Sequence, residues 1–171
     1  MITFKYVNIS GPSGQCDCCG GYSGSGKAIY VNGQLAWEQY FDGHLGGRQT
    51  EGKLVDNVLR AWYEAKLYNL KSHYSEEGRA KWNADKPGNY IASTVESWNE
   101  RRQADIKMHN DDFEQIAKDC ENLPYDELLQ MKMIALWIES VSGDPIVIDT
   151  ENLYEDNEDD NLDSSYYTEY D

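Results

Sequence analysis

Long hydrophobic runs are absent from this chain of 171 residues, and proline and histidine are scarce, with four and three copies. No stretch approaches the roughly 20 apolar residues that a membrane-spanning helix needs. The first residues also lack the charged and apolar regions of a signal peptide. We therefore expect a cytoplasmic protein with no membrane partner.

The chain has only four cysteines, and three of them, Cys16, Cys18 and Cys19, fall within four residues. Such crowding is unlike the spread-out framework of a small disulfide protein. Cys16 and Cys19 have the spacing of a zinc knuckle, with Cys18 as a third thiolate and His44 or His109 as the fourth ligand. A second Cys-x-x-Cys is missing. Zinc therefore remains an alternative to free thiols or a local redox pair, and no other cofactor is expected.

Catalytic motifs are also lacking. Gly21–Lys27 matches the spacing of a phosphate-binding P-loop up to its lysine, but Ala28 stands where the motif requires a hydroxyl residue. The segment also leads into a predicted strand, where a P-loop requires a helix. Cys18 or Cys19 with His44 as a base would make a nucleophilic pair, yet nothing in the sequence brings them together. We assign no catalytic residues and keep a Cys/His enzyme as an alternative.

Positive charge is nearly absent from the last third of the chain. Residues 1–110 carry 13 Lys/Arg and 12 Asp/Glu, whereas residues 111–171 carry 2 and 19, within a total of −16. A protein that binds nucleic acid directly shows the opposite sign. Arg101 and Arg102, one turn after Trp98, are better explained by a salt-paired helix face. We expect a basic, nucleic-acid-binding protein as the partner and no direct contact with nucleic acid.

The strand signals predict an α+β domain over residues 1–148 with a small antiparallel sheet. Alternation from Ile2 to Ile9 predicts a first strand, and residues 10–26, with six glycines, predict a loop. Asn32-Gly33 lies between two β-prone runs and predicts a hairpin at about 28–41. Pro145–Ile148 predicts a last strand.

At least three helices are expected to pack on this sheet. Apolar spacing predicts helices over about 51–72, from Ser75 through Trp82, and from Ile91 to about Ile106. Asn110 is predicted to cap a further helix, in which Phe113, Ile116, Ala117 and Cys120 form an apolar stripe. Pro124 is predicted to open the last helix, which Gly143 ends.

The acidic residues are the candidate binding surface. Seven acids and one lysine lie between residues 111 and 127, largely opposite the apolar stripe, and residues 149–171 form a predicted tail with ten acids and no base. Aromatic residues among the acids supply rigid contact area. The candidate partner-binding residues are Asp111, Asp112, Glu114, Asp119, Glu121, Asp126, Glu127, Tyr154, Glu155, Asp156, Glu158, Asp159, Asp160, Tyr166 and Tyr167.

Such a surface would imitate a DNA backbone and block a protein that binds one. The extended tail carries about one acid every 7 to 8 Å, while a DNA strand has a phosphate about every 3.4 Å. Mimicry therefore requires helix and tail acids to converge. The composition resembles that of phage and plasmid inhibitors of restriction or CRISPR nucleases, which implies an inhibitor in the host cytoplasm. The alternatives are an adaptor whose tail docks on a basic protein, and acidity that only maintains solubility.

Overall fold

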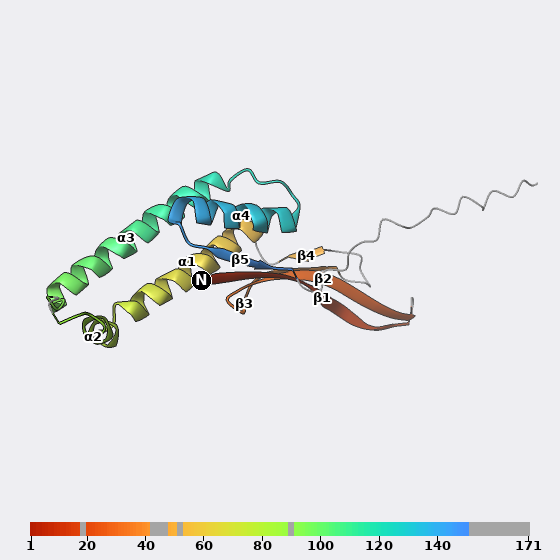
Figure 1. The fold of residues 1–171 in the computed structure, drawn as a ribbon. Helices are drawn as coiled ribbons and strands as arrows, with labels where there is room; N and C mark the ends of the chain where they lie inside the picture. Colours follow the sequence, from red (N-terminus) through yellow and green to blue (C-terminus); the bar gives the residue numbers. More distant parts are fainter. Residues whose placement is uncertain (18–19, 42–47, 51–52, 89–90, 151–171) are drawn as a thin grey trace, which may run out of the picture.

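One mixed sheet and four helices make up the residues that the structure, a computed structural model, describes: 1–17, 20–41, 48–50, 53–88 and 91–150 (Figure 1). The strand order is β4-β3-β2-β1-β5. The strands are β1 (Ile2–Cys16), β2 (Gly20–Val31), β3 (Gln34–Phe41), β4 (Arg48–Thr50) and β5 (Ile146–Asp149). The helices are α1 (Leu54–His73), α2 (Glu76–Ala84), α3 (Val95–Asp119) and α4 (Glu127–Ser142). The α+β class is confirmed.

The predicted hairpin at 28–41 is confirmed in β2 and β3. Its two turn residues, Asn32 and Gly33, have φ values of 49° and 79°. Two successive positive φ angles match the right-handed twist of the strands, and asparagine and glycine adopt them most readily. This local signal was sufficient because the turn geometry depends on residues that are adjacent in sequence.

The prediction of a loop over residues 10–26 is wrong. β1 and β2 pair antiparallel over this stretch, with one irregularity between Ser10 and Ser13. A side chain at Gly11 would have its Cβ 2.8 Å from the backbone carbon of Gly24, so the glycines permit close strand contact here. Paired backbone hydrogen bonds compensate for the low strand propensity of these residues.

The predicted antiparallel sheet is also corrected. β5 lies beside β1 and runs parallel to it, with Ile2 opposite Ile146 and Lys5 opposite Asp149. A parallel neighbour requires a long crossover connection, and the four helices supply one. Asp149, the first residue of the predicted tail 149–171, is the last residue of β5, so this boundary is one residue too early.

The first two helices confirm the predictions for residues 51–72 and 75–82. α1 begins at Leu54, and residues 51–52 lie outside the described part of the chain. α2 begins after Ser75, whose hydroxyl accepts a hydrogen bond from the Gly78 amide at 3.1 Å. This contact satisfies one of the amides that a helix start leaves without a partner.

The two helices predicted on either side of Asn110 are one continuous helix, α3. Thr94 caps it, and Asn110 lies inside it, where its side-chain oxygen accepts a hydrogen bond from the Tyr63 hydroxyl at 2.7 Å. Asparagine was read as a cap because its side chain competes with the backbone for hydrogen bonds. In the folded protein that side chain has a partner on α1 instead.

The predicted last helix and last strand are both present, but their bounds differ by one to three residues from the prediction. Asp126 caps α4, since its carboxylate accepts from the Leu129 amide at 2.6 Å, so the helix begins three residues after Pro124. Gly143 ends the helix in the left-handed region with φ of 70°. Glycine is the residue that most readily adopts this conformation.

The core lies between the sheet and the helices. α1 and α4 pack on one face of the sheet, and α3 packs across them (Figure 1). The core residues are Ile2, Phe4, Tyr6, Ile29, Val31, Trp37, Leu54, Val58, Leu59, Trp62, Ile116, Cys120, Met131, Ile134, Ala135, Ile138 and Ile146. No helix in the described part of the chain is long and apolar enough to cross a membrane.

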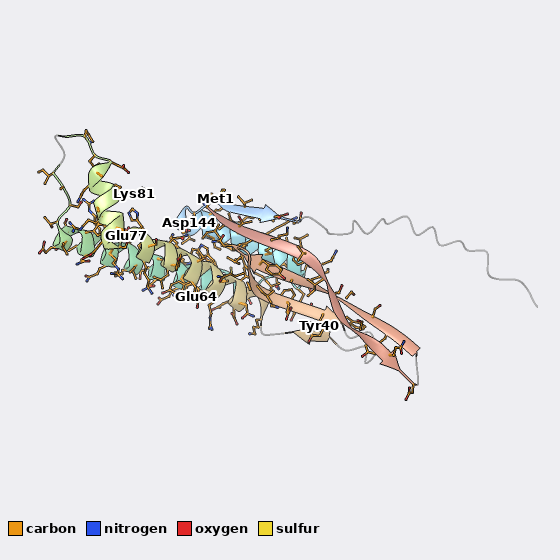
Figure 2. All side chains as sticks on the ribbon, turned by 90° about the horizontal axis from the view of Figure 1, so that it is seen from below. Met1, Tyr40, Glu64, Glu77, Lys81 and Asp144 are labelled. Atoms are coloured by element: carbon orange, nitrogen blue, oxygen red, sulfur yellow. The ribbon has the colours of Figure 1, made fainter. Side chains whose placement is uncertain are left out.

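The molecule is elongated. Seen from below, β1 crosses in front of α4, and the paired ends of β1 and β2 project beyond the helices (Figure 2). Glu77 and Lys81 of α2 mark the opposite end (Figure 2). The chain thus has a strand end and a helical end, and the start of α4 and the end of β5 lie toward the strand end (Figure 1).

Candidate functional site

The face of the sheet toward the helices changes from apolar to polar at Tyr6. On β1 the buried row Ile2, Phe4 and Tyr6 continues with Asn8 and Ser10, because alternate residues of a strand share a face. The paired residues Lys27 and Ser25 lie opposite them on β2. The change coincides with the start of α4, beyond which that helix no longer covers the strands (Figure 1).

A cavity of about 730 Å³ occupies this polar region, and we call it the strand-face cavity. This volume falls within the range of small-molecule binding sites, roughly 300 to 1,000 Å³. Its walls are strand residues on one side and the first turn of α4 on the other. The lining residues are Tyr6, Asn8, Ile9, Ser10, Gly24, Ser25, Gly26, Lys27, Gln39, Tyr40, Phe41, Asp126, Glu127 and Leu128.

Tyr6 is the buried member of this lining. Only 2% of its surface is exposed, yet its hydroxyl has no hydrogen-bond partner among the described residues. Burial raises the pKa of Tyr6, and the negative charges of Glu127 and Asp126 raise it further, so the hydroxyl keeps its proton. A buried polar group without a partner costs free energy, which makes this hydroxyl the least satisfied part of the wall.

Lys27, which the sequence placed in a P-loop-like segment, lies at the same cavity. Its ammonium nitrogen is 5.8 Å from the centre of the Tyr6 ring. The preceding Gly26 is extended, and a Cβ there would lie 2.4 Å from the Gln39 carbonyl oxygen of β3. The glycine therefore permits close strand pairing, and the segment is not a turn that wraps a phosphate.

The end of β5 lies next to this site. Asp149 is opposite Lys5, one residue before Tyr6, and its carboxylate is 3.2 Å from the Lys5 ammonium. The same Tyr6 experiences the charges of Asp126 and Glu127. Since neighbouring residues of a strand point to opposite faces, the Lys5–Asp149 pair lies on the face of the sheet away from Tyr6, although β5 ends at nearly the same level along β1.

The acids of residues 111–127 divide into two groups. Asp111, Asp112 and Glu114 lie midway along α3, whereas Asp119, Glu121, Asp126 and Glu127 surround its connection to α4. We call the second group the acidic end. As predicted, the carboxylates avoid the buried face: Ile116 and Cys120 are buried, while Asp111, Glu114 and Glu121 are exposed.

Some of these carboxylates have local partners. Asp111 pairs with Lys107 at 2.5 Å, Asp119 accepts from Gln115 at 3.1 Å, and Asp126 caps α4. These contacts alone account for three of the seven acids as ordinary features of helices. Among the described residues, Asp111 is the one of these seven acids that forms an ion pair, and neutral amide donors leave Asp119 and Asp126 charged, so six of the seven carry uncompensated charge.

Several predicted site residues lie outside the part of the chain that the structure describes. Cys18, Cys19 and His44 of the predicted metal and nucleophile sites are outside the described residues, and Cys16 is described only as the last residue of β1. The predicted tail residues Tyr154, Glu155, Asp156, Glu158, Asp159, Asp160, Tyr166 and Tyr167 are also outside them. The zinc and enzyme alternatives therefore remain predictions.

Three other candidates are internal. His109, considered as a fourth zinc ligand, is fully buried between α1 and α3 and contacts the Tyr63 carbonyl. Cys120 is 2% exposed and belongs to the core, as its stripe predicted. Trp98 is 3% exposed and packs against Tyr74 and Trp82, so its ring is not available to stack on a base.

Sequence reasoning missed the cavity residues Tyr6, Asn8, Lys27 and Gln39. The signal was present in β1, because Ile2, Phe4, Tyr6, Asn8 and Ser10 alternate and turn polar after the third member. The change indicates a cavity wall only once the fold places the start of α4 above it. No protein-family model, curated protein or solved structure matches this chain.

Proposed function

We propose that this protein is an acidic inhibitor that binds the basic nucleic-acid site of a partner protein, in the manner of a DNA mimic. The observation that supports this most directly is that β5 ends opposite Lys5, one residue along β1 from Tyr6, while the charges of Asp126 and Glu127 at the start of α4 act on Tyr6. Mimicry needs helix and tail acids to converge on one region. In this proposal, segment 151–171, which follows β5 in the chain, joins the acids at the start of α4.

Charge density also favours this proposal. From Asp111 to Asp119, where α3 ends, there are four acids in nine residues, and a helix rises about 1.5 Å per residue. The mean axial spacing is therefore about 3 to 4 Å, close to the phosphate spacing along one DNA strand, which is about 3.4 Å. Lys107 and Lys118 reduce the net negative charge of this stretch. We therefore propose that segment 151–171, with nine acids and no base, supplies the charge still needed to match a DNA strand.

The first experiment is recovery of partners from host lysate on the tagged full-length protein at low and high salt. We expect a nuclease or another nucleic-acid-binding protein, with less recovered at high salt, because the Debye length falls to about 3 Å at 1 M. Duplex DNA added as a competitor should release the partner. Recovery of no nucleic-acid-handling protein would contradict the proposal.

A pair of matched variants tests whether the position of the charge matters. The first neutralises Asp112, Glu114 and Glu121, and the second neutralises Glu76, Glu77 and Asp85 around α2 at the helical end. Both lose three acids, so they have the same net charge. We expect the first to weaken binding of the recovered partner at least about tenfold and the second to leave it within about twofold. Equal losses would show that only net charge acts.

A truncation discriminates the inhibitor from the adaptor alternative. The chain should end after Thr150, because removal of Asp149 would also remove its ion pair with Lys5 and shorten β5. An inhibitor that uses the helix acids should keep measurable binding without residues 151–171. Complete loss of binding, with the folded body intact by circular dichroism, would favour an adaptor that docks through its tail.

A further inference from the structure

We infer that the strand-face cavity is the binding site for an arginine side chain of the partner, with the guanidinium between Tyr6 and the Asp126 and Glu127 carboxylates. This inference rests on the proposed function, since it names the partner group that the acidic end would hold. It begins from a cavity of about 730 Å³ whose α4 wall carries two carboxylates and whose floor contains a buried hydroxyl.

The carboxylates alone would not indicate a ligand. Asp126 caps α4 through one of its oxygens, and Glu127 occupies the first turn, where a helix favours negative charge. Neither role explains Tyr6. Of the buried side-chain atoms without a hydrogen-bond partner among the described residues, the Tyr6 hydroxyl is the one whose residue lines this cavity.

The chemistry of the wall suits a guanidinium better than an ammonium. A guanidinium has five donors in one plane, so it can meet several acceptors at once. The second oxygen of Asp126, the Glu127 carboxylate and the Tyr6 oxygen are acceptors on two sides of the cavity. Phe41, which is 46% exposed at the same cavity, offers an aromatic surface, and guanidinium groups stack on such surfaces.

Lys27 determines the direction in which the ligand enters. Its ammonium lies over the Tyr6 ring and would repel another cation nearby, but the two carboxylates outnumber it. The guanidinium should therefore lie toward α4, with the peptide carbonyl groups of the ligand toward Lys27. Removal of the lysine charge should therefore strengthen binding of an isolated arginine side chain.

The test is an NMR titration of the full-length, isotopically labelled protein with Nα-acetyl-arginine amide. The control ligand is Nα-acetyl-citrulline amide, which has nearly the same shape but no charge. We expect saturable shifts of the amides of Tyr6, Glu127 and Leu128 with the arginine probe and at least about tenfold weaker binding of citrulline, because charge-assisted hydrogen bonds are lost.

Four variants locate the site. Glu127→Gln and Tyr6→Phe should each weaken arginine binding several-fold, and Lys27→Gln should strengthen it. Glu121→Gln is the matched control, because Glu121 belongs to the acidic end but does not line the cavity. Tyr6→Phe removes only an unpartnered hydroxyl, so it should fold normally, and its melting temperature verifies this.

Shifts that do not saturate, equal binding of citrulline, or equal losses in the Glu121 and Glu127 variants would overturn the inference. The proposed function fails independently. If the recovered partner binds the Glu127→Gln and Tyr6→Phe variants normally, the inhibitor stands and the arginine site falls. If arginine binds the cavity but no nucleic-acid-binding partner is recovered, the site stands and the proposed function falls.

Discussion

The imidazole of His109 stacks on the ring of Tyr63, with centroids 4.6 Å apart and planes 14° from parallel. Its Nε2 lies 2.8 Å from the Tyr63 carbonyl oxygen, which only accepts, so Nε2 carries the proton. The same ring meets Trp62 edge-on at 5.0 Å. This buried neutral imidazole joins the middle of α3 to α1.

His109 should make the protein less stable in mild acid. Burial lowers the pKa of His109 below its ordinary value of 6.5. Above that pH the imidazole is neutral in both folded and unfolded chains, and the full stability is present. As the pH falls below 6.5, the unfolded chain binds a proton that the folded protein resists, so the free energy of unfolding decreases. Urea denaturation at steps from pH 7.5 to 5.5 measures this decrease.

The control for this prediction is His109→Phe, which keeps an aromatic ring between the helices but does not titrate. Its free energy of unfolding should depend less on pH over the same interval. Parallel curves for the two proteins would assign the pH dependence to other groups.

Gly143→Ala should destabilise the protein by about 1 to 2 kcal/mol, because a side chain in the left-handed region clashes with its own backbone. Its φ is 70°, and nothing lies within 4 Å of the position of a new Cβ, so conformation alone would cause the loss. Gly88→Ala is the matched control, with the same open space and no positive φ. It should be neutral or stabilising by up to about 1 kcal/mol. Similar losses in thermal denaturation would contradict this explanation.

Cys120 should resist alkylation in the folded protein. Burial raises the pKa of its thiol to about 11, with a further contribution from Asp119, and only the thiolate reacts. Iodoacetamide at pH 8, followed by peptide mass spectrometry, should leave Cys120 unmodified in buffer and modify it in urea. Rapid modification in buffer would show that α3 does not bury this residue.

Phe4→Ala should cost about 3 to 5 kcal/mol, because it removes a large side chain with no exposed surface from the middle of the core. Ile91→Ala, at a residue that is 89% exposed, should change stability by no more than about 0.5 kcal/mol. Chemical denaturation of both variants measures the difference. A small loss at Phe4 would be inconsistent with the packing of β1 against α4 and α1.

The features that sequence predicted correctly depend on neighbouring residues. The Asn32-Gly33 turn, the Ser75 cap and the end of α4 at Gly143 all follow from conformations that these residue types adopt locally. The helix over 51–72 and the burial of Cys120 follow from apolar periodicity. In each case the information lies within one turn or one helix face.

The features that the sequence predicted wrongly depend on contacts with residues distant in the chain. Ser10 to Gly26 look like a loop until the two halves pair as β1 and β2. Asn110 looks like a cap until Tyr63 of α1 donates a hydrogen bond to it. The parallel position of β5 follows from where the helices return the chain, which no local pattern encodes.

The sequence by itself therefore determined the α+β class, most helix positions and the concentration of acids in the last third. Only the tertiary structure decided that the start of α4 lies over the polar part of the sheet, and that Tyr6 is buried there with no hydrogen-bond partner for its hydroxyl among the described residues. The physical reason is that propensity and periodicity act within a segment. Burial and charge at a site result from segments that the fold brings together.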